Sequence, residues 1–125
     1  MKTVLIVDDD MVSLRTMHAF LRDNYNVLMA RSPATALMTL AVEEEIDFVL
    51  LDYEMPICDG IQTLALIRSV EKFKRMPVFF MTGVTDPDMV RQALKYNPAG
   101  YLLKTLDKKA VLARIEQFFN NYKPY

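Results

Sequence analysis

The 125-residue chain is poor in residues on which several kinds of site depend. Its three glycines are too widely spaced to form a dinucleotide-binding G-x-G-x-x-G motif or a phosphate-binding P-loop. The single cysteine, Cys58, excludes an internal disulfide and a thiolate metal cage. The apolar run at residues 4–7 leads straight into three aspartates and is too short for a signal peptide, and no run approaches a membrane span. These absences favour a reduced, soluble, cytoplasmic domain.

The charges are close to balance, with 15 Lys and Arg against 16 Asp and Glu and a formal net charge of −1. Non-specific nucleic-acid binding draws most of its free energy from phosphate neutralisation, which this composition does not favour. Hydrophobic residues make up 52% of the chain, enough for a sizeable core. We therefore expect a single domain over residues 1–125 that binds neither nucleic acid directly nor a membrane.

Five short apolar or β-branched runs alternate with segments of helical periodicity. They have the length of strands and lack polar alternation, which is typical of strands covered on both faces. Capping residues stand where helices would begin, namely Ser32, Asp86 and Asp107. The strands are predicted at residues 3–7, 25–30, 46–51, 77–81 and 100–103. The pattern predicts a doubly wound α/β domain, in which helices cover both faces of a five-stranded parallel sheet.

Polar residues follow four of these strands: Asp8 and Asp9 the first, Asp52 the third, Thr82 the fourth and Lys104 the fifth. The carboxyl ends of parallel strands share one edge, so we expect these side chains to converge there. Two carboxylates about 4 Å apart repel by roughly 4 kcal/mol at an effective dielectric near 20. A hard cation such as Mg²⁺ would neutralise the acids, and a lysine and a hydroxyl could hold phosphoryl oxygens. Capping alone explains a lone aspartate, but not this set.

The ordered motifs resemble the response-regulator receiver domain, the family of the chemotaxis protein CheY. The resemblance extends from about residue 2 to residue 121 and implies the flavodoxin-like strand order 2-1-3-4-5. It also implies a role in two-component signal transduction. The matching stretches are residues 4–10 (VLIVDDD), 52–56 (DYEMP), 59–60 (DG), 78–83 (VFFMTG) and 100–104 (GYLLK).

The resemblance implies a role for each site residue. Asp52 would accept a phosphoryl group from a histidine kinase or a phosphotransfer protein. Lys104 would pair with that group, Thr82 would swing to hydrogen-bond it, and Tyr101 would turn inward in step. The fourth helix, fifth strand and fifth helix would then present a switched surface to a downstream protein, in a monomer or a phosphorylation-dependent dimer. The Mg²⁺ ligands would be Asp8, Asp9, Asp52 and the backbone carbonyl of Glu54.

The sequence departs from the family pattern in the loops around this site. Thr105 follows Lys104 where the family usually has proline, commonly after a cis bond. A cis non-proline bond costs about 3 kcal/mol, which favours a trans bond here. Cys58 occupies a loop position more often held by a larger apolar residue. Glu54 and Val84 occupy the positions that modulate dephosphorylation, which predicts a phosphoryl lifetime different from that of a sequence with Asn and Glu there.

Two other functions fit part of the pattern. In a haloacid-dehalogenase-like phosphatase, Asp8 would be the nucleophile and Asp10 the acid–base residue. That enzyme needs an acidic pair at a further strand end, whereas only Asp107 and Glu116 follow the lysine, both in the last amphipathic segment. A receiver-like module that is never phosphorylated would typically lack one of the acids or the lysine. We therefore expect a phosphoacceptor, with at most weak self-dephosphorylation, rather than an enzyme.

Overall fold

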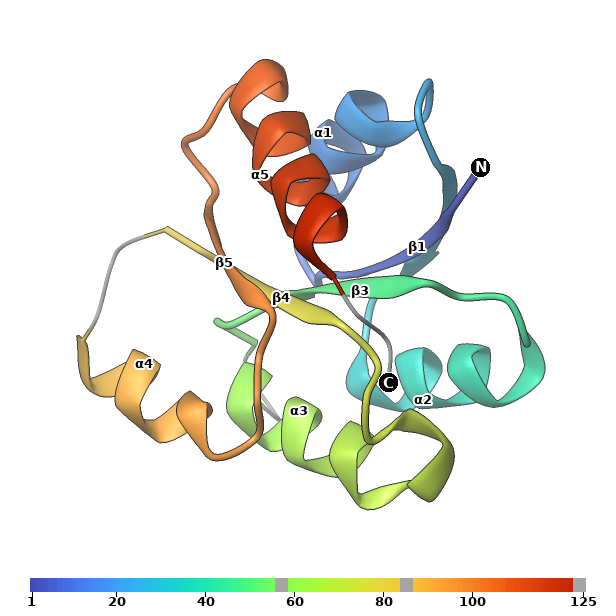
Figure 1. Cartoon of the computed structure of the whole chain (residues 1–125), viewed down its shortest axis with the longest axis vertical. Helices are drawn as coiled ribbons and strands as arrows, with labels where there is room; N and C mark the ends of the chain where they lie inside the picture. The colour runs from blue at the N-terminus through green and yellow to red at the C-terminus, as the bar shows by residue number, and fades with distance from the viewer. Residues whose placement is uncertain (56–58, 84–86, 123–125) are drawn as a thin grey trace.

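The structure is a computed structural model that describes residues 1–55, 59–83 and 87–122 (Figure 1). Five parallel strands form one sheet in the order β2-β1-β3-β4-β5, the order implied by the resemblance. The strands are β1 (Thr3–Val7), β2 (Asn26–Ala30), β3 (Phe48–Asp52), β4 (Val78–Thr82) and β5 (Gly100–Leu103). The helices are α1 (Met11–Leu21), α2 (Pro33–Val42), α3 (Gly60–Ser69), α4 (Pro87–Leu94) and α5 (Lys108–Asn121), with a short 3₁₀ turn, η1 (Glu71–Phe73). The predicted features at Cys58, Val84 and Asp86 lie outside the described residues.

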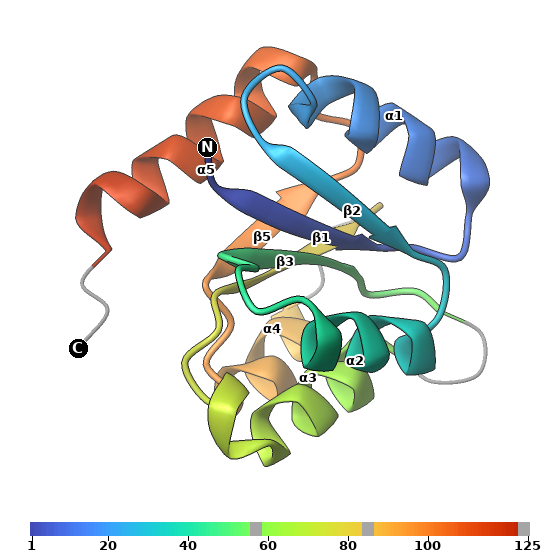
Figure 2. The same ribbon diagram turned by 90° about the vertical axis from the view of Figure 1, so that its right-hand side faces the viewer.

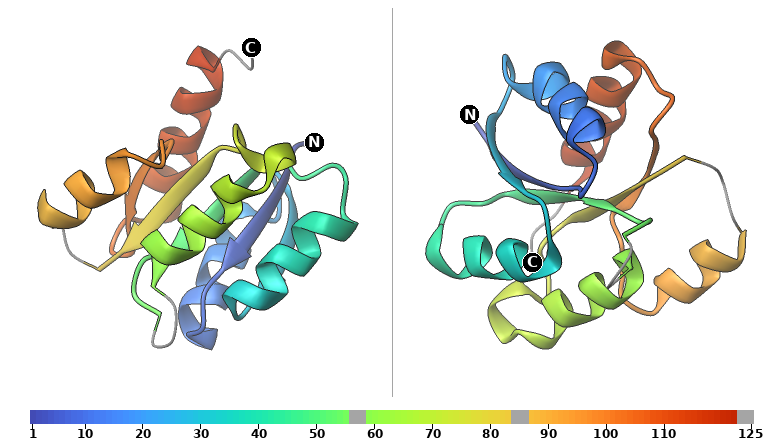
Figure 3. Two further views of the ribbon diagram at one scale, coloured as in Figure 1. Left: turned by 90° about the horizontal axis from the view of Figure 1, so that it is seen from below. Right: turned by 180° about the vertical axis from the view of Figure 1, so that it is seen from behind.

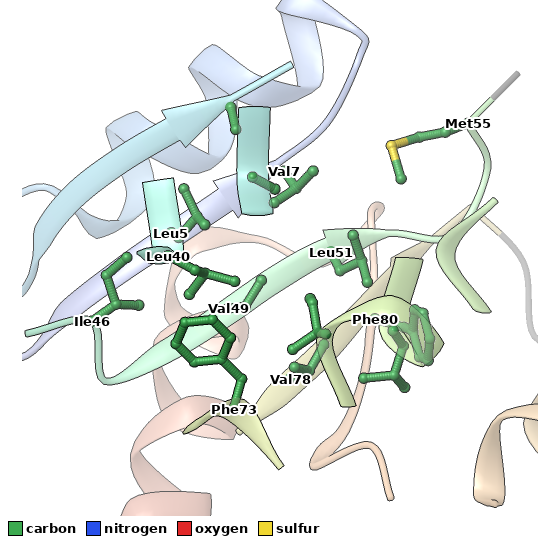
Figure 4. Close-up of a cluster of buried hydrophobic side chains, with 14 of the residues drawn as sticks. Leu5, Val7, Leu40, Ile46, Val49, Leu51, Met55, Phe73, Val78 and Phe80 are labelled. Carbon is green, nitrogen blue, oxygen red and sulfur yellow. The ribbon is translucent and has the colours of Figure 1, made fainter. Parts of the chain in front are cut away.

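The sheet lies between two layers of helices, α1 and α5 on one face and α2, α3 and α4 on the other (Figures 1 and 2). Side chains alternate between the faces of each strand, so every strand contributes to two cores. In β1, Val4 and Ile6 pack in the cluster of α1 and α5, whereas Leu5 and Val7 pack in the opposite cluster. Figure 4 shows this second cluster. The predicted doubly wound α/β fold is confirmed.

Three strands begin or end one or two residues away from their predicted bounds. The amide of Tyr25 closes the end of α1 by donating to Leu21 O at 2.9 Å, so β2 begins one residue later. β3 and β4 each run one residue further than predicted, because Asp52 pairs with Met81 and Thr82 with Leu103 in the sheet. Two site residues therefore belong to strands rather than to the loops that follow.

The expectation that every strand is covered on both faces is wrong for the two edges of the sheet. The central strands β3 and β4 are buried at every position, whereas β2 is buried only at Ala30 and β5 alternates between buried and half-buried residues. An edge strand has a neighbour on one side only, and the helices wrap it less completely. Figure 3 shows the strands side by side between the helical layers.

The helix starts follow from side-chain capping. Ser32 Oγ accepts a hydrogen bond from the amide of Thr35 at 3.2 Å, and Asp107 Oδ1 accepts one from Ala110 at 2.8 Å. Both caps are as predicted. Every described peptide bond is trans, including the one after Lys104. None of the described helices is long and apolar enough to cross a membrane.

Candidate functional site

Three carboxylates meet at the carboxyl edge of the sheet. Asp8 directly follows β1 and Asp52 ends the adjacent strand β3, so the pairing of the two strands brings them together. Both are buried, at 0% and 1% exposed, whereas Asp9 is half-buried. One carboxylate oxygen from each of the three lies within 4.8 Å of the other two. The sequence-based expectation that these acids converge agrees with this geometry.

Lys104, which directly follows β5, extends its side chain to the same cluster of acids. Its amide donates to Thr82 O at 2.8 Å, which extends the pairing of β4 and β5 and sets the direction of the lysine side chain. The Nζ atom lies 3.0 Å from Asp52 Oδ1 and 3.5 Å from Asp8 Oδ2. The contact with Asp8 is an ion pair without a hydrogen bond, since Asp8 Oδ2 has no hydrogen-bond partner. One ammonium group thus lies between two buried carboxylates.

The electrostatics show that this single cation does not neutralise the site. Burial raises the pKa of Asp52, the hydrogen bond from Lys104 opposes it, and the charge of Asp8 adds to the rise, giving a pKa of about 6. Burial lowers the pKa of Lys104, but its interactions with Asp52 and Asp8 outweigh burial, and the pKa is raised. The protein without a metal ion therefore disfavours the fully ionised acid cluster.

The donor atoms at the cluster fit a Mg²⁺ ion. Asp8 Oδ1 accepts a hydrogen bond from the amide of Asp10 at 2.9 Å, and Asp52 Oδ1 accepts one from the amide of Glu54 at 3.2 Å. Asp8 Oδ2, in contrast, is buried without a hydrogen bond, and the ammonium of Lys104 at 3.5 Å is its ion-pair partner, which it shares with Asp52. An all-oxygen set of donors suits a hard divalent cation.

The other two predicted site residues lie on β4 and β5. Thr82 ends β4 and is buried at the same edge of the sheet. The ring of Tyr101 stacks on Phe80, with centroids 5.9 Å apart and planes 18° apart. Its hydroxyl is buried without a hydrogen-bond partner, and burial raises the pKa of the phenol. Tyr101 therefore faces inward in this structure.

Gly60 shapes the floor of the site, and the sequence alone gave no reason for it beyond its place in a motif. A Cβ atom at this position would lie 2.7 Å from Tyr53 Cα, 2.9 Å from Asp52 O and 2.8 Å from Phe80 Cε1. Two of these atoms are backbone and cannot move aside cheaply. Only glycine lets α3 begin this close to the strand that carries Asp52.

Asp10, which a phosphatase would use as its acid–base residue, is a helix cap. Its carboxylate accepts hydrogen bonds from Ser13 Oγ at 2.9 Å and from the amide of Val12 at 3.2 Å. These bonds hold the pKa of Asp10 below its usual value, with the serine bond contributing most. An exposed carboxylate that caps α1 and stays ionised is a poor general acid.

The chain is similar to known proteins in both sequence and fold. The sequence profile of the response regulator receiver domain matches residues 4–116. The chain belongs to this family. The chemotaxis protein CheY of Pseudomonas aeruginosa is 27% identical over 117 residues, which cover 93% of this receiver domain and 94% of that protein. The solved structure of Vibrio cholerae CheY4 at low pH superposes with a TM-score of 0.89 at 24% identity, covering 94% of this chain and 98% of that one, and so supports the fold.

A longer relative contains the receiver domain as one part. The transcriptional regulatory protein ZraR of Escherichia coli K12 is 36% identical over 115 residues, which cover 91% of this chain but 25% of ZraR. The chain thus spans about a quarter of the length of that relative. Receiver domains belong to two-component signal transduction, in which they generally serve as phosphoacceptors and typically bind Mg²⁺. They interact with histidine kinases and downstream effectors.

Proposed function

We propose that Asp52 of this receiver domain accepts a phosphoryl group from a histidine kinase or phosphotransfer protein in a Mg²⁺-dependent reaction. The observation that carries the proposal is the buried carboxylate of Asp52 at the carboxyl edge of the sheet, 3.0 Å from Lys104 Nζ and beside two further acids. The hydrogen bonds from Lys104 and from the amide of Glu54 orient this carboxylate before any donor arrives.

The chemistry needs little from the protein beyond position and charge. A carboxylate oxygen of Asp52 attacks the phosphorus of a phosphohistidine, the P–N bond breaks, and the imidazole leaves as an acyl phosphate forms. Lys104 pairs with an oxygen of the transferred group and the hydroxyl of Thr82 donates to another. Asp8, Asp9, Asp52 and the carbonyl of Glu54 would hold Mg²⁺, which offsets the negative charge that gathers during transfer.

On this proposal the domain is a phosphoacceptor and not an enzyme, with residues 1–125 acting as one unit. Asp10 caps a helix, which argues against the phosphatase, and the complete set of acids and lysine argues against a module that is never phosphorylated. Glu54 and Val84 would set the rate of self-dephosphorylation, and exchanging their side chains for Asn and Glu should change the decay rate of the acyl phosphate.

The signal would leave through α4, β5 and α5. A phosphoryl group held by Thr82 and Lys104 changes the charge at the ends of β4 and β5, and Tyr101 lies on β5 beside Phe80 of β4. We propose that a downstream protein, or a second receiver domain, binds this surface in the phosphorylated state. The exchange would take place in the cytoplasm, where histidine kinases have access to ATP.

The test is incubation with acetyl phosphate, with and without Mg²⁺, read by intact mass. We expect a Mg²⁺-dependent gain of one phosphoryl group that Asp52→Asn abolishes and that the exposed control Asp23→Asn retains. Labelling that survives Asp52→Asn and disappears in Asp8→Asn would favour the phosphatase. No adduct on any variant, under conditions that label a known receiver domain, would favour the phosphorylation-independent module.

A further inference from the structure

Positive charge is concentrated at the amino ends of the strands, which lie opposite the carboxyl ends that carry Asp52. The connection from α3 to β4, the connection from α4 to β5 and the last turn of α5 lie together there, on the left-hand side of Figure 2. Residues 68–75, 95–99 and 118–122 include five Lys and Arg and one carboxylate, Glu71, in a chain whose net charge is −1. The strands between this edge and Asp52 are roughly 15 Å long.

Two adjoining hollows occur among these segments. One has a volume of about 350 Å³ and the other of about 370 Å³, and both are lined by Arg68, Lys74, Arg75 and Asn97. Lys95 lines the second hollow, and Tyr122 lines the first. We call the two hollows together the basic groove. Volumes of this size are typical of small-molecule sites.

Arg68 builds the walls of the basic groove. Its guanidinium donates to Tyr96 O at 2.8 Å, to Phe73 O at 3.0 Å and to Asn97 O at 3.0 Å. These carbonyls come from both connections, so one side chain ties the two together and keeps the groove open. Asn97 contributes the left-handed backbone, with φ of 54°, that turns its carbonyl toward this contact. The shape of the groove is therefore set before any ligand arrives.

The charge of Arg68 has no carboxylate partner among the described residues. A guanidinium has five N–H donors, and three carbonyl bonds leave two unused. Burial lowers the pKa of Arg68, as expected for a cation that neighbouring acids do not compensate. Glu71 pairs with Lys74 at 2.7 Å, but both side chains are well exposed and such pairs contribute little.

The basic groove also offers an aromatic wall. Phe118 and Tyr122 line the first hollow, with ring centroids 5.2 Å apart. Tyr96 lines the second, with Lys95 Nζ 5.3 Å from its ring centroid. Cations and partly exposed aromatic rings within one hollow suit an anion that carries a flat aromatic group. An acidic peptide would use the cations but leave the rings without a matching partner.

We propose that the basic groove binds a nucleotide, with its phosphates on Lys74, Arg75 and Lys95 and its base against the ring of Tyr122. This site lies at the opposite edge of the sheet from Asp52 and does not depend on the phosphoacceptor chemistry. It gives the receiver domain a second input, a small anionic metabolite, beside the phosphoryl group.

Calorimetric titration of the full chain with ATP, at low ionic strength and in EDTA, tests the proposal. EDTA prevents Mg²⁺ from bridging ATP to the acid cluster. We expect the double variant Arg75→Glu/Lys95→Glu to bind ATP at least tenfold more weakly than the unaltered chain. The control Arg15→Glu/Lys109→Glu makes the same change in net charge at exposed positions away from the groove and should bind ATP as the unaltered chain does.

Two further probes separate the phosphates from the base. Tyr122→Leu should weaken the binding of ATP several-fold and leave the binding of tripolyphosphate unchanged. Absence of ATP binding, or equal losses in the two double variants, would overturn the proposal. So would tripolyphosphate binding as tightly as ATP with no effect of Tyr122→Leu, or a polyglutamate peptide binding more tightly than ATP, which would point to an acidic protein segment.

Discussion

The charge of Asp52 should destabilise the folded receiver domain when no metal ion is present. Its pKa rises from 3.8 to about 6 on folding, chiefly because the carboxyl group is buried. One pKa unit corresponds to about 1.4 kcal/mol, so the ionised form of Asp52 lowers the free energy of unfolding by up to about 3 kcal/mol. Asp52→Asn keeps the shape and removes the charge. We therefore expect this variant to be more stable than the unaltered chain by about 1 to 3 kcal/mol at pH 7.5 in EDTA.

The pH dependence of this stability difference tests independently whether the charge of Asp52 causes it. A raised pKa means that the folded state binds the proton more tightly than the unfolded state does. At or below pH 4 the folded protein holds Asp52 neutral, and the two proteins should be nearly equal in stability. The difference in the free energy of unfolding between Asp52→Asn and the unaltered chain should grow between about pH 4 and pH 6 and then stay constant. Added Mg²⁺ should narrow it at pH 7.5, because the ion binds the folded, ionised site and stabilises it by mass action.

Urea denaturation followed by circular dichroism measures each of these differences. Asp23→Asn is the matched control, since its side chain is exposed and its ion pair with Lys108, at 3.6 Å, contributes little. This control should stay within about 0.5 kcal/mol of the unaltered chain. The free energy of unfolding should depend on urea concentration with the same slope in both proteins. If Asp52→Asn is then no more stable than the unaltered chain in EDTA at pH 7.5, Lys104 compensates the charges of both acids and the reasoning is wrong.

Four other substitutions test the packing, one of them as a control. Gly60→Ala should lower the free energy of unfolding by about 1 to 3 kcal/mol in urea, because its Cβ would press on backbone at 2.7 and 2.9 Å, whereas Gly83→Ala, with only Glu54 Oε1 at 3.9 Å, should be nearly neutral. Tyr101→Phe should leave the melting temperature unchanged or raise it slightly, because it removes a buried hydroxyl that has no hydrogen-bond partner. Arg68→Met should destabilise by about 2 to 4 kcal/mol in urea, since three carbonyls lose their donor.

Each of these predictions would be contradicted by a specific result. Equal losses for the two glycine variants would mean that the close contacts at Gly60 do not set the effect, since backbone entropy by itself favours alanine over glycine at both positions. A drop of more than about 1 kcal/mol for Tyr101→Phe would show that the hydroxyl has a hydrogen-bond partner in solution. A stable Arg68→Met would show that water satisfies the three carbonyls, and that Arg68 does not hold the walls of the basic groove.

Much of the fold was readable from local pattern. Buried parallel strands appear as short apolar runs, and helix starts appear as capping side chains such as Ser32 and Asp107, because both depend on neighbours in the sequence. The ends of β3 and β4 were misplaced because Asp52 and Thr82 belong to the ladder through their partners Met81 and Leu103. The polarity of Asp52 and Thr82, taken alone, suggested that both lie in the loops after the strands.

The convergence of the acids was also readable, because the carboxyl ends of parallel strands must share an edge. The apolar runs and the residues after them determined that Asp8, Asp52 and Lys104 would meet. Tertiary structure alone decided how: that Lys104 Nζ pairs with Asp52 more closely than with Asp8, and that one oxygen of Asp8 is left without a donor. Differences of half an ångström depend on packing, which no periodicity encodes.

The sequence by itself gave no signal for Arg68 or for the basic groove. Arg68 lies 28 and 29 residues from the Tyr96 and Asn97 carbonyls that it binds, so nothing local marks it as different from the other surface cations. Sequence pattern determines which elements form and in what order they can stack. The contacts between loops at one end of a sheet depend on where those elements finally lie, and only the folded chain brings them together.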